Sequence, residues 1–169
     1  MAESKNPTIA PYAGTGEVKL RVTASLPEGE DAEALLQPAI KKILAAAGDY
    51  CYGIDVPDLQ TAAVQSLRQK GLTVASAESC TGGLVAARLT EVPGASAVFG
   101  CGIVSYNNTV KAEVLGVDPA IIEQHTAVSA ETAAAMAEAV RKKSGADIGI
   151  GVTGNAGPSA SEGQPVGLV

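Results

Sequence analysis

The alternation of apolar and polar residues predicts a small α+β unit at the start of the chain. In residues 17–24, EVKLRVTA, apolar and polar side chains alternate strictly, as in a half-buried β-strand. Residues 1–16 before it are polar and contain several prolines and glycines, so we expect them to be extended or irregular. An Ala- and Leu-rich stretch that ends at Ala47 has apolar residues near helical spacing, with Pro38 expected to start or kink the helix. The segment GDYCYG, which follows, is expected to form a further short strand.

From about residue 58 onward, segments with strand and helix patterns alternate. Three apolar runs, LTVASA, AVFGCGIVSY and ADIGIGVTG, predict buried strands. Gly100 and Gly102, in the second run, predict a bulge or a close backbone approach. The alternation predicts an α/β fold, a three-layer α/β/α sandwich, with the N-terminal unit as a small α+β appendage. Capping and stop signals for the helices are Asp58, Gly71, Pro93, Gly94, Gly116, Asp118, Pro119 and Ser129.

The composition narrows the possible classes of function. With a formal net charge of −6 in 169 residues, no general attraction to nucleic acid or to an anionic membrane is expected. The three cysteines, Cys51, Cys80 and Cys101, have no CxxC spacing, and the sequence indicates no disulfide framework, metal site or cofactor. The N-terminal residues lack the pattern of a secretory signal, and no apolar run reaches the roughly 18 residues of a membrane span. We therefore expect a soluble, cytoplasmic protein.

Candidate reactive segments follow all three predicted strands of the second part. In open α/β sheets, ligands bind beyond the carboxyl ends of the strands, where loops and helix N-termini converge. The first strand leads into AESCTGG at residues 77–83, Tyr106 ends the second with Lys111 shortly after it, and the third leads into TGNAGPSASEGQP from Thr153. Taken singly, each segment also fits a structural role such as a helix cap, a packed aromatic residue or a turn. Their coincidence at one edge of the sheet predicts the functional site.

Two candidate nucleophiles lie side by side in AESCTGG. The backbone amides that follow Ser79, at a helix start, are suited to hold an oxyanion or a phosphate. Cys80 is intrinsically the stronger nucleophile, but the single histidine, His125, is expected to be structural, so a Cys–His pair has weak support. Without a histidine, the base for Ser79 would be a lysine whose pKa is lowered by burial or a tyrosine near a cation. Lys111 and Tyr106 are candidates of these two types.

Several ordered motifs carry a resemblance to a known family. From about residue 58 to the end, ESCTGG, VSYNN, NNTVKAEVLGV and TGNAGP resemble the C-terminal domain of the CinA family, competence/damage-inducible protein A, known also as nicotinamide mononucleotide deamidase. The segments NPTIAPYA and GDYCYG resemble the KH-like region of longer members. The resemblance implies a KH-like region at residues 1–55 and an amidohydrolase domain at 56–169. It implies hydrolysis of a small nucleotide, nicotinamide mononucleotide, to nicotinic acid mononucleotide and ammonia, by a homo-oligomer.

The resemblance also implies roles for individual residues. Ser79 would attack the amide carbonyl, its proton would move toward Lys111, and Tyr106 would relay or orient that proton. Glu78 is expected to pair with the pyridinium ring or to orient Lys111, and Thr153 with the glycine-rich loop is expected to bind ribose or phosphate. The expected substrate-binding residues are Glu78, Cys80, Thr81, Gly82, Gly83, Thr153, Gly154 and Gly157.

The chain departs from the family pattern at several positions. Asn155 stands where an isoleucine is usual and Gln164 where a lysine is usual, which concerns phosphate or ribose affinity more than the chemistry. The family continues past PVGTV with further strand and helix, so we expect PVGLV at residues 165–169 to begin a strand and the C-terminus to be incomplete. An exposed edge of that kind favours association. The alternative function is an inactive module that keeps the pocket and binds a nucleotide or a protein partner.

Overall fold

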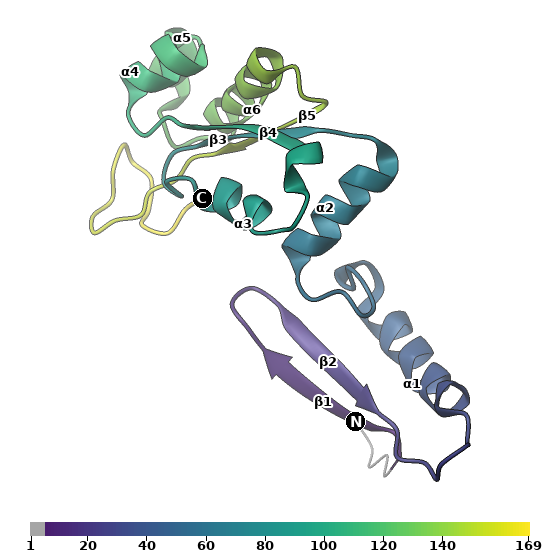
Figure 1. Ribbon diagram of the computed structural model, residues 1–169. Helices are drawn as coiled ribbons and strands as arrows, with labels where there is room; N and C mark the ends of the chain where they lie inside the picture. Colours follow the sequence, from purple (N-terminus) through teal and green to yellow (C-terminus); the bar gives the residue numbers. More distant parts are fainter. Residues whose placement is uncertain (1–5) are drawn as a thin grey trace. The chain divides into compact units, whose positions relative to one another are not determined.

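The computed structural model describes residues 6–169, and the chain divides into two compact units (Figure 1). The first unit ends at Leu59 and the second begins at Gln60. The first five residues of the N-terminal stretch that we expect to be extended or irregular lie outside the described residues. The two units are described in turn.

The first unit is a two-stranded antiparallel sheet followed by one helix. Strand β1 (Thr8–Ala13) pairs with β2 (Val18–Thr23), and α1 (Ala32–Ala47) follows, with Pro38 inside it. The expectation of a half-buried strand at residues 17–24 is wrong, because most of β2 is exposed. The helix that packs against β2 is α1, which is too little to bury one face of this small sheet. The strand expected in GDYCYG is also wrong. Residues Gly48–Tyr50 form a 3₁₀ turn instead, closed by a hydrogen bond from the Cys51 amide to the Gly48 carbonyl.

The second unit is built on a three-stranded parallel sheet in the order β4–β3–β5. Its central strand, β3 (Val74–Glu78), is buried at every position and pairs with β4 (Phe99–Val104) and β5 (Ile148–Val152). Between the pairs Val74–Phe99 and Ala75–Cys101 the register shifts by one residue, so Gly100 is left out of the ladder. This confirms the bulge that the glycines in the second apolar run predict.

Helices cover both faces of this sheet, which confirms the predicted three-layer α/β/α sandwich (Figure 1). One apolar cluster joins the sheet to α2 (Leu59–Lys70) and α3 (Leu84–Thr90). A second cluster on the opposite face includes Met136 and Val140 of α6 (Ala130–Ser144). The shorter helices are α4 (Asn108–Val110), which continues into a π-helical turn (Lys111–Leu115), and α5 (Pro119–His125). None of the helices within residues 6–169 has the length and apolar character needed to span a bilayer.

Two glycines of β5 allow α6 to lie directly on the sheet. A β-carbon on Gly149 would lie 2.0 Å from the carbonyl oxygen of Ala137, and one on Gly151 would lie 2.1 Å from that of Ala133. Neither separation is possible for real atoms, so any side chain at these positions would push the helix away. The alternating glycines of IGIGV therefore set the distance between α6 and the strand that ends at the site.

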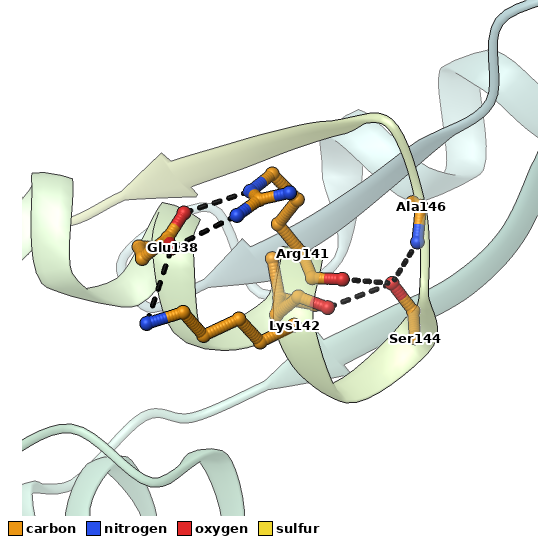
Figure 2. A network of polar contacts seen from close by, with 6 residues as sticks. Glu138, Arg141, Lys142, Ser144 and Ala146 are labelled. Atoms are coloured by element: carbon orange, nitrogen blue, oxygen red, sulfur yellow. Dashed lines mark hydrogen bonds and ion pairs between the residues drawn. The ribbon is translucent and has the colours of Figure 1, made fainter.

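The C-terminal end of α6 is fixed by polar contacts on its surface (Figure 2). Glu138 accepts hydrogen bonds from Arg141 and pairs with Lys142, and these contacts lower the pKa of Glu138 to about 2. Ser144 donates its hydroxyl hydrogen bond to the preceding helical turn and accepts one from the Ala146 amide at 3.2 Å. The helix thus ends at a defined residue, from which the chain turns back into β5.

The segment after β5 is an irregular loop, and the strand expected at residues 165–169 is wrong. Its polar backbone groups are satisfied within the loop: the amide of Asn155 donates to the carbonyl of Leu168, and that of Gly167 donates to the carbonyl of Asn155. The Asn155 side chain is buried and bridges the loop, donating to the carbonyls of Ser159 and Gln164. The loop therefore folds against its own start and does not extend the sheet.

Candidate functional site

The three strand ends meet, as the sequence predicts, and form one wall of a pocket. Backbone hydrogen bonds join the ends, because the Ser79 amide donates to the carbonyl of Val152 at 2.9 Å and the Ser105 amide to that of Glu78 at 2.7 Å. The pocket has a volume of about 370 Å³. Its lining includes Ser79, Cys80, Tyr106, Asn108, Lys111, Ala127, Thr153, Gly154, Asn155, Gly157, Ser161 and Glu162.

Ser79 and Lys111 are in direct contact at this pocket. The Lys111 Nζ lies 3.1 Å from the Ser79 Oγ, 3.0 Å from the carbonyl oxygen of Ser105 and 3.1 Å from that of Tyr106. A neutral lysine amine has two N–H donors and one lone pair. In the structure Nζ donates to the Ser79 Oγ and to both carbonyls, while the Ser79 hydroxyl donates to the Tyr106 carbonyl. Once Lys111 has lost a proton, the two carbonyls can take its two remaining donors, which leaves its lone pair for the serine hydroxyl. This is the geometry of a nucleophile with its general base.

The surroundings of Lys111 favour its neutral form. The side chain is 1% exposed, on the π-helical turn that follows α4. Burial lowers the pKa of Lys111, and the nearby charges of Glu162 and Cys80 raise it by less, so the net shift is downward. Because a lysine acts as a base only after losing its proton, a lowered pKa enlarges the active fraction at neutral pH.

Tyr106 holds the site through its backbone. Its carbonyl oxygen accepts from the Lys111 Nζ and from the Ser79 Oγ, the latter at 3.3 Å. Its side chain is 72% exposed, and no hydrogen bond of the described residues joins the phenol to Ser79 or Lys111. The Tyr106 carbonyl therefore contacts both groups, and the expectation that Tyr106 relays or orients the serine proton stays a prediction.

Glu78 does not orient Lys111, which corrects one expectation. It is 1% exposed and faces the start of α3, where Oε2 accepts from the amides of Gly83 and Val85 and Oε1 accepts from that of Ala86. The Thr81 hydroxyl donates to the same carboxylate at 2.7 Å. The carboxylate neutralises the positive end of the helix, and Glu78 is not among the residues that line the pocket.

The amides that can bind an oxyanion are fewer than expected. Of the four that follow the nucleophile, that of Gly82 already donates to the carbonyl of Ser79 and that of Gly83 to Glu78. The amides of Cys80 and Thr81 have no hydrogen-bond partner among the described residues. The candidate oxyanion hole therefore consists of these two amides, the first of which belongs to the residue directly after Ser79, the position that supplies an oxyanion-hole amide in α/β-hydrolases.

The predicted binding residues after β5 also line the pocket. Thr153 is buried and donates its hydroxyl to the carbonyl of Ala127 at 2.7 Å. Gly154 has no room for a side chain, since a β-carbon there would lie 2.6 Å from the Leu168 carbonyl oxygen and 3.0 Å from the Cys80 Sγ. Gly157 has a φ of 87°, in the left-handed region that favours glycine. Thr153, Gly154 and Gly157 all line the pocket.

Several residues of the lining are not among the predicted site residues, and two of them, Glu162 and Asn108, have polar side chains that also line a second pocket. Glu162 lies in the loop after β5, and its Oε2 accepts from the Ala127 amide at 2.8 Å. Asn108 begins α4, and together with Glu162 it also lines an adjoining pocket of about 560 Å³ beside α5. Asn108 lies in VSYNN and Glu162 in TGNAGPSASEGQP, but neither residue has a predicted role of its own there. Only the general rule that loops after parallel strands form the site could have indicated them.

His125 and the potential metal ligands take no part in the contact between Ser79 and Lys111. His125 ends α5 and lies 3.8 Å from Glu131, so its described contact is with the start of α6 and not with the pocket. Within residues 6–169, no three His, Cys, Asp or Glu side chains gather as a metal site. The reactive groups that the described residues bring together at the pocket are the Ser79 hydroxyl and the Lys111 amine, beside the two backbone amides.

This fold and this site define an α/β/α protein of the CinA C-terminal class. Residues 57–169 match the family model of the CinA C-terminal domain, and residues 1–53 match that of the damage-inducible protein CinA KH domain. The chain therefore belongs to the CinA family, as the resemblance of its motifs implies.

Individual relatives agree with this assignment. The CinA-like protein of Desulfovibrio desulfuricans is 46% identical over 170 aligned positions, which cover 100% of this chain and 40% of the relative. That of Dictyoglomus turgidum is 47% identical over 165 positions, covering 97% of this chain and 40% of the relative. The chain thus spans about 40% of the length of these relatives.

Solved structures have the same fold. The competence-damaged protein (CinA) superfamily protein from Escherichia coli matches with a TM-score of 0.64 and 31% identity, over 72% of this chain and 74% of that chain. The competence/damage inducible protein CihA from Agrobacterium tumefaciens matches with a TM-score of 0.61 and 42% identity, over 64% of this chain and 66% of that chain.

Proposed function

We propose that this chain hydrolyses the carboxamide of nicotinamide mononucleotide to nicotinic acid mononucleotide and ammonia. The observation that carries the proposal is the separation of 3.1 Å between the buried Lys111 Nζ and the Ser79 Oγ, at a pocket of about 370 Å³. That volume lies within the range of about 300–1,000 Å³ usual for small-molecule sites. The substrate class and the specific reaction are those that the resemblance of the motifs implies, and membership in the CinA family supports them.

In the first half of the reaction, the Ser79 Oγ attacks the carboxamide carbon as its proton passes to the Lys111 Nζ. The carbonyl oxygen becomes an oxyanion, which the amides of Cys80 and Thr81 are placed to stabilise. The protonated Lys111 then gives its proton to the amide nitrogen, and the C–N bond breaks to release ammonia. An ester between the serine and the pyridine carboxyl group remains.

In the second half, a water molecule takes the place of ammonia. Lys111, neutral again, accepts a proton from the water as its oxygen attacks the ester carbon. The bond to Ser79 breaks, the serine oxygen recovers the proton from Lys111, and the carboxylic acid leaves. The Tyr106 carbonyl, which contacts both side chains, keeps them aligned through the two halves.

The test is ammonia release from nicotinamide mononucleotide by the purified chain. Ser79→Ala should abolish release while leaving nucleotide binding measurable by calorimetry. Lys111→Met keeps a long buried side chain and removes the base, so it should lower kcat by at least about 100-fold. Cys80→Ser is the matched control next to the nucleophile, and it should retain most of the activity.

Three outcomes separate the alternatives. An inactive Cys80→Ser with an active Ser79→Ala would make the thiolate the nucleophile. Nucleotide binding with no ammonia release from any variant, the parent chain included, would support a nucleotide-binding module in place of an enzyme. Absence of both binding and release would refute nicotinamide mononucleotide as the ligand.

A further inference from the structure

Glu162 is the one carboxylate among the described residues that line the Ser79 pocket together with Lys111, and its side chain is exposed. Of the residues that line the Ser79 pocket, Lys111 and Glu162 are the two with charged side chains. Ion pairs within 4.0 Å in the described part of the chain do not include one between them. The negative charge of Glu162 nevertheless raises the pKa of Lys111, by less than burial lowers it. The two opposite charges therefore both border this pocket without forming an ion pair with each other.

The Glu162 carboxylate is held in place by a hydrogen bond to the backbone of Ala127. Its Oε2 accepts from the Ala127 amide at 2.8 Å, and the carbonyl of Ala127 accepts from the buried Thr153 hydroxyl at 2.7 Å. No described hydrogen bond uses Oε1. Glu162 itself has a φ of 52°, a left-handed conformation that is unfavourable for a residue with a β-carbon and is often retained at functional sites.

The other titratable groups around this space do not offset the carboxylate. Cys80 is the other group that raises the pKa of Lys111, in the same direction as Glu162. In the adjoining pocket that Glu162 also lines, the further charged residue is Glu123 of α5, again an acid. A ligand placed between Lys111 and Glu162 thus meets a negative charge on the loop side.

We infer that Glu162 is a specificity residue that selects amides carried on a cationic ring, such as a pyridinium, over amides on a neutral ring. The inference rests on the proposed function and deepens it. It also transfers to Glu162 the ring-pairing role that the sequence assigns to Glu78, whose carboxylate caps α3 instead.

The same arrangement couples recognition to catalysis. In the free site, the negative charge of Glu162 favours the protonated form of Lys111, which cannot accept the serine proton. A cationic ring between the two groups neutralises that charge and adds its own positive charge near Lys111. Both changes lower the lysine pKa, so the correct ligand produces the base that acts on it. A neutral ring leaves the lysine as it was.

The first experiment measures binding without turnover. In the Ser79→Ala protein, calorimetry compares nicotinamide mononucleotide, whose ring is cationic, with its 1,4-dihydro form, whose ring is neutral and whose ribose phosphate is the same. We expect the cationic form to bind about tenfold more tightly. Glu162→Gln keeps an oxygen for the Ala127 amide and removes the charge, so it should abolish this preference. Glu113→Gln removes an exposed acid that lines neither pocket and should keep it.

The second experiment measures the pH profile of kcat/KM in the chain with Ser79 intact. The rate requires neutral Lys111, so it falls as the pH drops through the pKa of that lysine. Removing the carboxylate in Glu162→Gln lowers this pKa, and the acidic limb should move to lower pH. A residue that only anchored the loop would leave the limb unchanged, because glutamine can still accept from Ala127.

The outcomes distinguish this inference from the proposed function. A charge preference that disappears in Glu162→Gln supports the inference even if the chain releases no ammonia, in which case the proposed reaction alone fails. Ammonia release with equal binding of the two nucleotides, or with the same preference in Glu162→Gln, would overturn the inference and leave the reaction standing. Failure of both nucleotides to bind would overturn both.

Discussion

Replacing Glu78 with alanine should lower the free energy of unfolding by roughly 3 to 5 kcal/mol. The carboxylate is buried and accepts hydrogen bonds from the amides of Gly83, Val85 and Ala86 at 3.2, 2.9 and 2.9 Å. The Thr81 hydroxyl donates to it as well. Alanine would leave all of these donors without an acceptor at the start of α3.

The magnitude follows from the kind of contact that is lost. Loss of a helix cap alone costs about 1 kcal/mol, and the charge of a carboxylate at a partly buried helix N-terminus adds up to about 2 kcal/mol. Each buried donor left unpaired costs about 1 to 3 kcal/mol, but the contributions are not additive because the first turn of a short helix can rearrange. Glu78→Gln keeps the size and one acceptor oxygen, so about half of the loss is expected.

Urea unfolding at pH 7 measures these differences. Glu91→Ala is the matched control, because Glu91 is an exposed acid at the other end of α3, and its replacement should change stability by less than about 0.5 kcal/mol. A loss below about 1 kcal/mol for Glu78→Ala, together with loss of ammonia release, would refute the capping role. It would return Glu78 to the substrate or to Lys111.

Acid unfolding gives an independent check on Glu78. Burial would raise the pKa of its carboxyl, but the hydrogen bonds from Thr81, Val85, Ala86 and Ser76 outweigh burial and hold it below its ordinary value of 4.5. A group with a lowered pKa contributes stability above its unfolded-state value and loses it as the pH falls through the folded-state value. The stability difference between the parent chain and Glu78→Gln should therefore narrow below about pH 4.

Four further substitutions test the fold and the site. Gly151→Ala should destabilise the second unit by more than about 3 kcal/mol in thermal melts, because its β-carbon would lie 2.1 Å from a carbonyl oxygen of α6. Gly100→Ala has open space around its β-carbon and should leave the stability nearly unchanged. Asn155→Leu removes the hydrogen bonds that bridge the last loop. The rate of proteolysis within residues 154–168 and the KM should therefore both rise, while the melting temperature falls only slightly. Tyr106→Phe should keep kcat within about twofold, because the carbonyl contacts the catalytic pair, and a loss near 100-fold would restore the phenol as a proton relay.

Much of the fold could be predicted because its signals are local. Ser129 caps α6 and Asp118 with Pro119 begins α5, as their types and positions indicate. The convergence of Ser79 and Lys111 could also be predicted, since the carboxyl ends of parallel strands meet at one edge of a sheet. Their contact of 3.1 Å depends in addition on a π-helical turn, for which the sequence has no signal.

The incorrect predictions come from contacts that a linear pattern does not contain. The segment PVGLV has the composition of a strand, but its amides and carbonyls pair within the loop around Asn155. Glu162 belongs to no periodic element, and it reaches the pocket because the amide of Ala127, 35 residues earlier, holds its carboxylate. Long-range contacts of this kind decide how a loop folds, and they are visible only in three dimensions.

Glu78 and Ser79 are adjacent at the end of β3, and the negative charge of Glu78 limits which amides can bind an oxyanion formed at Ser79. Glu78 places a full negative charge at the start of α3 and takes up three of its amides, so the helix end has little positive field left for a substrate. The oxyanion hole must then depend on the turn between strand and helix, through the amides of Cys80 and Thr81. The Glu78 cap fixes that turn from within by holding the Thr81 side chain. Substitutions that loosen the cap without unfolding the chain should therefore lower kcat while leaving KM nearly unchanged, because they disturb donors that act on the transition state and not on the bound nucleotide.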